Sequence, residues 1–187
     1  MARSIAAFLA LFIVALPAAG FADANGWAAL TKGGAVAILR HAQTVPGIGD
    51  PPGFRLDDCA TQRNLSEEGR AQARALGEAF RARKAPVDKV LTSAWCRSRD
   101  TAVLLELGPV SVEPALNSFF GGQGDERAQT AALRRIVAGW KGPGNLVLVT
   151  HQVNMTALTG VFPSQGETFV LVPAPDGFQL AGRIAAP

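Results

Sequence analysis

The chain is poor in the residues that most often carry chemistry: it has two histidines and two cysteines among 187 residues, and no block of lysine or arginine. A nucleic-acid partner is not expected, because the basic residues are dispersed and the net charge is only +3. A metal centre is disfavoured as well, since two histidines without a neighbouring Asp, Glu or Cys cluster do not make a usual ligand set. The mildly basic balance, with a pI near 9.3, fits a small anionic ligand better than a polymer.

The overall composition is that of a folded domain. Hydrophobic residues make up 48% of the chain and charged residues 18%, which indicates a sizeable core and excludes a disordered chain. A length of 187 residues predicts one domain. Beyond the first residues, no segment is long and apolar enough to cross a membrane, and no internal repeat or linker is present.

Residues 1–22 have the pattern of a secretory signal peptide. Arg3 supplies a short positive segment, residues 5–16 are uninterrupted apolar residues, and Pro17 ends this run before the small residues of a cleavage site. The run falls short of the roughly 20 residues that span a bilayer, which disfavours the alternative of an uncleaved membrane anchor. We therefore expect a periplasmic or secreted protein whose mature domain spans residues 23–187.

Strands and helices are expected to alternate along this domain, with short apolar runs as strands and amphipathic stretches as helices. The turn Asp176-Gly177 predicts a hairpin between 168–172 and 178–184. This alternation predicts an α/β fold of three layers, α/β/α, around a mostly parallel central sheet. The other expected strands are 35–39, 87–91, 110–116 and 146–150, and the expected helices are 25–32, 66–85, 96–107, 125–140 and 153–159.

Both histidines directly follow an apolar strand. His41 follows residues 35–39 and Arg40, and His151 follows the strand that ends at Thr150. Open α/β sheets bind ligands at the rim formed by the carboxyl ends of their strands. We expect the two histidines to serve a site at this rim, and two structural histidines that cap strand ends are the alternative.

Arg40, Arg97, His41 and His151 together suit a dianionic, tetrahedral oxyanion. Arginine presents paired donors that match phosphate oxygens. Arg97 opens an expected helix, whose N-terminal N–H groups add further donors. An imidazole can also attack phosphorus and carry the phosphoryl group covalently. The set therefore predicts phosphate chemistry.

Four segments, in order along the chain, resemble the histidine phosphatase superfamily, whose fold is phosphoglycerate mutase-like. Residues 39–44, Leu-Arg-His-Ala-Gln-Thr, stand at its Arg-His-Gly motif, with Ala42 in place of the glycine. Residues 64–73 resemble its following helix, 92–102 the segment with its second arginine, and 149–151 the segment with its second histidine. The resemblance covers nearly the whole mature chain and implies the same fold.

The resemblance also implies a role for each site residue. His41 would be the nucleophile that becomes phosphorylated, with its other ring nitrogen donating to a backbone carbonyl. Arg40, Arg97 and His151 would bind the phosphoryl group and stabilise its charge. Catalysis would depend on positioning and electrostatics, with no metal and no cofactor. The implied activity is an exported phosphatase that hydrolyses a phosphomonoester, or a phosphoramidate, through a phosphohistidine intermediate.

The general acid of this family is missing from both of its usual places. Ser118 stands where many relatives carry Glu, and Gln152 stands where another branch carries Asp. Glu113, Asp125 and Glu126 are the candidates, and the last two are favoured because the preceding glycine-rich loop could fold over the site. A solvated helix N-terminus is the alternative interpretation of these acids, and a missing acid would suit a leaving group that needs little protonation.

Cys59 and Cys96 are expected to form a disulfide, because export implies an oxidising compartment and two cysteines allow a single pairing. Two reduced thiols are the alternative.

The expected location also favours a small phosphorylated substrate, such as an envelope phospho-sugar, over cytosolic phosphoproteins. Residues 45–58 and 121–126 are expected to determine specificity. The alternative function is a non-catalytic phosphate or phospho-sugar binding protein of the same fold.

Overall fold

Six strands form one sheet in the computed structural model, which describes residues 18–187. The strands are β1 (Val36–Arg40), β2 (Val87–Thr92), β3 (Val110–Val112), β4 (Asn145–Thr150), β5 (Thr168–Ala174) and β6 (Gly177–Ile184). Their order is β3-β2-β4-β1-β5-β6. The pairs from β3 to β1 are parallel, whereas β5 runs antiparallel to both of its neighbours. The prediction of a mostly parallel sheet is confirmed.

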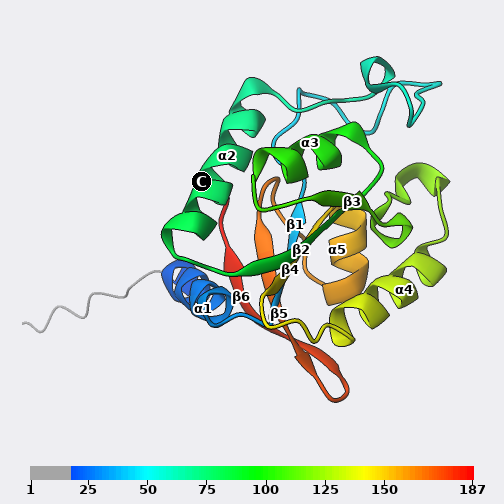
Figure 1. Cartoon of the computed structure of the whole chain (residues 1–187). Coiled ribbons are helices and arrows are strands. Elements are labelled where there is room, and N and C mark those ends of the chain that lie inside the picture. The colour runs from blue at the N-terminus through cyan, green and yellow to red at the C-terminus, as the bar shows by residue number, and fades with distance from the viewer. Residues whose placement is uncertain (1–17) are drawn as a thin grey trace, which may run out of the picture.

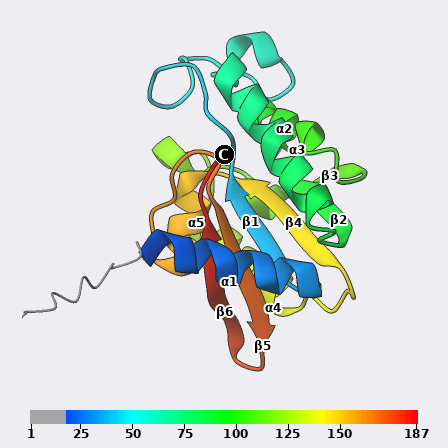
Figure 2. The same cartoon turned by 90° about the vertical axis from the view of Figure 1, so that its left-hand side faces the viewer.

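Helices cover both faces of this sheet, as Figures 1 and 2 show. The helices are α1 (Ala18–Lys32), α2 (Glu67–Ala82), α3 (Cys96–Leu104), α4 (Glu126–Ala138) and α5 (Gln152–Thr159). Helices α1, α2 and α3 lie on one face and α4 and α5 on the other, which confirms the predicted three-layer arrangement. Three short 3₁₀ turns, η1 (Cys59–Thr61), η2 (Pro114–Leu116) and η3 (Phe120–Gly122), lie in the connections.

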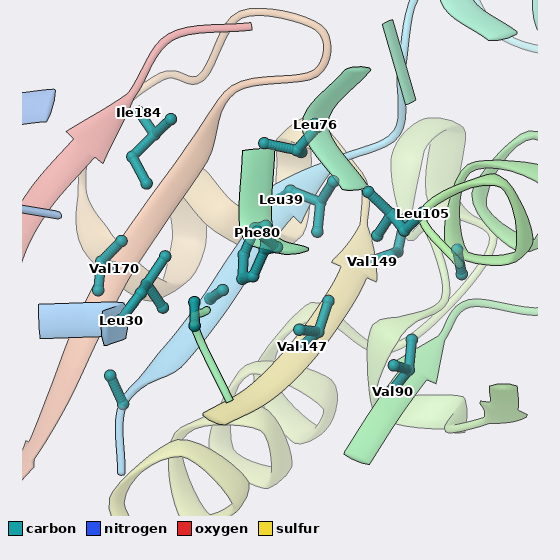
Figure 3. Packing of buried hydrophobic residues seen from close by; sticks show 14 residues of the cluster. Leu30, Leu39, Leu76, Phe80, Val90, Leu105, Val147, Val149, Val170 and Ile184 are labelled. Atoms are coloured by element: carbon teal, nitrogen blue, oxygen red, sulfur yellow. The ribbon is translucent and has the colours of Figure 1, made fainter. Parts of the chain in front are cut away.

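The core consists of two apolar clusters, one on each face of the sheet. Alternate residues of β1 point to opposite faces: Ala37 and Leu39 belong to one cluster, and Val36 and Ile38 to the other. Figure 3 shows the first cluster, where side chains of α1, α2 and α3 meet the sheet. Every residue of β4 is buried, as expected for a central parallel strand that is covered on both faces.

The helix boundaries follow local signals in the sequence. Ser66 caps α2, and its hydroxyl oxygen accepts the N–H of Gly69 at 3.1 Å, as its position before two glutamates predicts. The expected strand 110–116 is shorter than predicted, because β3 ends at Val112. Pro114 opens the turn η2 instead, since proline has no N–H to continue a strand ladder.

The expected signal peptide, residues 1–22, lies outside the described residues except for 18–22, which form the start of α1. Asp23, the expected first residue of the mature domain, accepts the N–H of Ala185 at 3.0 Å and so joins α1 to the chain after β6. Within residues 18–187, no helix has the length and apolar character needed to cross a membrane. The cleavage site and the export of the domain stay predictions.

Gly77 of α2 marks a close approach between α2 and the end of α3. A Cβ at this position would collide with the carbonyl oxygen of Leu105. Alanine normally favours a helix over glycine by about 1 kcal/mol, but overpacking reverses this gain. We expect Gly77→Ala to lower the free energy of unfolding by about 2 kcal/mol in urea denaturation. Glu78→Ala, at an exposed position of the same helix, should change it by less than about 0.5 kcal/mol. An unchanged midpoint for Gly77→Ala would contradict the close contact.

Candidate active site

The carboxyl ends of β1 and β4 bring the two histidines together at one edge of the sheet. Arg40 and Thr150 are opposite each other in this parallel pair, so the residues that follow them leave the sheet side by side. The ring centroids of His41 and His151 are 5.4 Å apart. Both residues are buried, with 3% of their surface exposed. The adjacency therefore follows from strand register.

A cavity of about 240 Å³ opens beside these rings. Arg40 at the end of β1, Arg97 in the first turn of α3 and Arg63 just before α2 all line it, together with His41 and His151. The four side chains proposed from the sequence are thus brought together, and Arg63 is an addition that the sequence analysis does not identify.

The three guanidinium groups lack partners for part of their donors. In the described part of the chain, Nε of Arg40, Arg63 and Arg97 is buried and has no hydrogen-bond acceptor. Burial lowers the pKa of each group, and repulsion among the three lowers the pKa values of Arg40 and Arg63 further. Cations whose Nε atoms are buried without an acceptor indicate that an anion is their natural partner.

His41 is held neutral by its hydrogen bond and its surroundings. Its Nδ1 is 2.9 Å from the carbonyl oxygen of Ala42, so Nδ1 carries the proton and donates it to that oxygen. Burial, followed by the positive charge of Arg97, lowers the pKa of His41 well below its ordinary value. The ring is therefore neutral, and the lone pair of Nε2 is free for attack.

His151 is fixed by hydroxyl groups of the segment after β2. Its Nε2 is 2.8 Å from Oγ of Ser93 and 3.4 Å from Oγ of Ser98. The Trp95 ring and the imidazole pack in a T-shaped arrangement, with centroids 5.3 Å apart. Burial, and then the neighbouring His41, lowers the pKa of His151 well below its ordinary value, so this ring is neutral too.

Asp50, in the loop 45–58, is the one carboxylate lining the cavity within residues 18–187. Its Oδ1 accepts a hydrogen bond from Nη1 of Arg97 at 2.7 Å and from the backbone N–H of Arg63 at 3.0 Å. Its Oδ2 accepts the indole N–H of Trp95 at 3.0 Å. Burial favours the neutral acid, but these donors outweigh it and hold the pKa of Asp50 below its ordinary value. Asp50 is therefore a charged organiser of the site and not a proton donor.

These charges leave the cavity positive. Three guanidiniums face one carboxylate while both imidazoles are neutral, so an excess of two positive charges remains. A dianionic phosphoryl group would balance that excess. The tetrahedral oxyanion expected from the sequence matches the site in both charge and donor type.

The candidate acids proposed from the sequence are not brought to the histidines. Asp125 caps α4, where its Oδ1 accepts the N–H of Ala128 at 2.9 Å. Glu126 is exposed and borders a separate shallow hollow between α4 and α5. Glu113 caps η2 and does not line the cavity. Their acidity suits helix ends, since an acid near a helix N-terminus is stabilising.

Cys59 and Cys96 are joined by a disulfide, with Cα atoms 5.7 Å apart. The N–H of Cys96 also donates to the side chain of Gln62 at 2.9 Å. Since Cys96 immediately precedes Arg97, these bonds tie the segment that carries Arg63 to the first turn of α3.

No metal ligand set is visible in the part of the chain that the structure describes, where no three His, Cys, Asp or Glu side chains are grouped as an ion would require. Two neutral histidines among three arginines suit an anionic ligand. Residues 36–135, more than half of the chain, match the family model of the histidine phosphatase superfamily, branch 1. The chain belongs to this superfamily. No curated protein sequence matches it at a significant level.

Solved structures, including those of two phosphatases, share this fold at low sequence identity. The protein histidine phosphatase SixA, complexed with tungstate, is 16% identical with a TM-score of 0.60, over 81% of this chain and 96% of its own. A mycobacterial glucosyl-3-phosphoglycerate phosphatase is 20% identical with a TM-score of 0.60, over 81% and 99%. An open reading frame product of Mycobacterium tuberculosis is 15% identical with a TM-score of 0.62, over 81% and 97%.

Asp50→Asn tests whether the carboxylate organises the site or merely competes with a bound anion. Loss of a negative charge alone would strengthen anion binding, whereas loss of the Arg97 anchor weakens it. We expect the affinity for tungstate, measured by titration calorimetry, to fall about tenfold, which corresponds to ~1.4 kcal/mol. Asp57→Asn makes the same charge change at an exposed position of the same loop and should have no effect. Tighter binding by Asp50→Asn would show that Asp50 competes with the anion.

The disulfide should contribute to stability because it limits the freedom of the unfolded chain. The bridge spans 37 residues in sequence, and a loop of this size contributes about 3–4 kcal/mol. We expect a Cys59→Ala, Cys96→Ala double variant to lose stability of this order in urea denaturation. The mass of the oxidised protein should be unchanged by alkylation before reduction and should rise by two alkyl groups after it. Alkylation without reductant would show that the thiols are free.

Proposed function

We propose that this protein is an exported phosphatase that hydrolyses a phosphomonoester, or a phosphoramidate, through a phosphohistidine formed on His41. The observation that carries this proposal is the neutral His41 ring, whose Nδ1 donates to Ala42 and whose Nε2 is free beside three guanidiniums. A nucleophile with an available lone pair and an anion cradle with two excess charges are the two requirements of phosphoryl transfer.

In the first step, the phosphoryl oxygens bind the guanidiniums of Arg40, Arg63 and Arg97. The Nε2 lone pair of His41 forms a bond to phosphorus while the bond from phosphorus to the leaving oxygen or nitrogen breaks, and that electron pair goes to the leaving atom. The arginines, together with His151, stabilise the charge on the equatorial oxygens. Because burial lowers the pKa of His41, this nucleophile stays unprotonated at neutral pH.

In the second step, water attacks the phosphohistidine. Its oxygen bonds to phosphorus, the phosphorus–nitrogen bond breaks, and Nε2 regains its lone pair. The water supplies a hydroxyl to the released phosphate and a proton that balances the one taken up by the leaving group. The net reaction consumes one water and needs no cofactor.

The site favours leaving groups that need little protonation. Asp50 is ionised, and the acids Glu113, Asp125 and Glu126 do not line the cavity. A phosphoramidate, whose nitrogen can be protonated before the bond breaks, and an ester of a weakly basic alcohol both meet this condition. Two of the three similar structures are those of a protein histidine phosphatase and a glucosyl-3-phosphoglycerate phosphatase, which supports phosphatase chemistry.

The proposed location is the periplasm or the medium, from the signal pattern of residues 1–22. In that location a small phosphorylated substrate, such as an envelope phospho-sugar, is the proposed partner. The disulfide between Cys59 and Cys96 is consistent with an oxidising compartment.

A non-catalytic phosphate-binding protein is the second candidate. The absence of a proton-donating carboxylate from the cavity lining of the described chain favours it, because binding needs the arginines but not an acid. It predicts oxyanion binding without turnover.

His41→Ala distinguishes these two functions. We expect the wild type to release phosphate from 4-nitrophenyl phosphate in the presence of EDTA, and kcat to fall at least about a thousandfold in His41→Ala because the nucleophile is lost. The wild type should also form a ³²P-labelled intermediate that survives alkali and is lost in acid, as phosphohistidine does. Arg55→Ala, at an exposed position of the loop 45–58, is the control and should keep its activity. Tungstate binding without any turnover would establish the binding protein instead.

A further inference from the structure

One set of side chains in the cavity lining differs from the arginines in that its members are uncharged. We call it the leaving-group subsite, because a substrate whose phosphoryl group lies among the arginines would place its remaining atoms there. The members are Ile48, Ser118, Phe120, Gln123, Gln152, Val153 and Gln165, and the buried Trp95 also lines the cavity.

Two large apolar side chains of this subsite are exposed to solvent. Ile48 is 90% exposed and Phe120 is 48% exposed, although both border a charged cavity. Gly49 lies against the Phe120 ring, since a Cβ at that position would be 3.4 Å from its Cε1. Two separate loops therefore present an apolar surface at the mouth, and such surfaces beside a polar pocket mark ligand contacts.

The amide groups of the subsite have open acceptors. Nε2 of Gln152 donates to Thr156 and Nε2 of Gln165 donates to Thr44, so each Oε1 is left free of protein donors in the described chain. Gln123 is exposed and makes no side-chain hydrogen bond to residues 18–187. Neutral amides suit hydroxyl groups, which both donate and accept.

No cation in the described chain lines this subsite beyond the three arginines that hold the phosphoryl group. A leaving group with a second negative charge would find no partner, and leaving that charge desolvated is costly. An uncharged group with hydroxyls and one apolar face fits better. A sugar ring has these properties, because its axial C–H bonds form an apolar face that packs on an aromatic ring.

The position of the phosphate on the sugar follows from the lack of a proton-donating carboxylate in the cavity lining of residues 18–187. With Asp50 ionised, the leaving oxygen takes its proton from water. The anomeric oxygen is the least basic oxygen that a neutral sugar offers, and it is therefore the best leaving group. Resting on the proposed phosphatase function, we infer that the substrate is a sugar phosphorylated on its anomeric oxygen, an aldose 1-phosphate.

The reaction balances without a further reactant. His41 Nε2 takes the phosphoryl group, the bond between phosphorus and the anomeric oxygen breaks, and the sugar alkoxide takes a proton from water. Hydrolysis of the phosphohistidine then yields phosphate, and the products are the free aldose and inorganic phosphate.

A substrate series tests this inference on the whole mature protein. The series comprises the 1-phosphates of glucose, galactose and mannose, together with glucose 6-phosphate, 3-phosphoglycerate and phosphoramidate. We expect kcat/KM for the best aldose 1-phosphate to exceed that of 3-phosphoglycerate at least about tenfold, because the latter has a charged leaving group, and to exceed that of glucose 6-phosphate. The leaving group of phosphoramidate is too small to contact the subsite. Its kcat/KM therefore reports only on the arginines and His41.

Phe120→Ala and Ile48→Ala then test whether these two side chains cause the preference for aldose 1-phosphates. Each should lower kcat/KM for the best aldose 1-phosphate about three- to tenfold and leave phosphoramidate within twofold of the wild type. Val103→Ala, at an exposed apolar position on α3, is the control and should change neither value.

The outcomes distinguish an error in the inferred substrate class from an error in the proposed phosphatase function. If glucose 6-phosphate or 3-phosphoglycerate is hydrolysed as well as the best aldose 1-phosphate, the inferred substrate class is wrong and the phosphatase stands. The same holds if Phe120→Ala and Ile48→Ala lower kcat/KM for phosphoramidate as much as for the best aldose 1-phosphate. If phosphoramidate and every ester resist hydrolysis, the phosphatase function itself is wrong, and the inferred substrate falls with it.

Discussion

The site depends on a single electrostatic constraint: three guanidiniums must be kept together without a permanent counterion for each. The buried pair of Asp50 and Arg97, 2.7 Å apart with side chains only 5% exposed, meets part of this need. Removing one partner from such a pair is costly, because the other charge stays buried and unpaired. Asp50 also accepts from Arg63 and Trp95, so one carboxylate connects the loop 45–58 to α3 and, through the indole ring, to His151.

Much of this arrangement could be predicted from local patterns in the sequence. A short apolar run that ends in a polar residue identifies both a buried strand and the rim where its last side chains gather, and this rule placed His41 and His151 correctly. Arg40 follows from the same run, and Arg97 from its position at the start of an expected helix. These predictions succeeded because strand register and helix starts are local properties.

The rest depends on tertiary contacts that have no local signature. Asp50 looks no different in sequence from Asp57 of the same loop, yet one is buried against Arg97 and the other is exposed. Arg63 lies outside any strand or helix, so nothing in the periodicity singles it out. The acids Asp125 and Glu113 were proposed as proton donors, but the structure shows that they cap helical turns. Their physical role at helix starts is satisfied without any part in the site.

The histidines are positioned by strands, whereas the proposed contacts to the rest of the substrate are made by loops. His41 and His151 directly follow the two central strands, where neighbouring backbone leaves little room for change. Ile48 and Asp50 are two residues apart in one loop, so this loop carries both the proposed contact to the leaving group and the carboxylate that pairs with Arg97. That loop leads to Cys59, which the disulfide ties to the residue before Arg97. Changes in the loop can therefore alter the leaving group that is accepted, but only those that keep Asp50 in place leave the phosphoryl site intact.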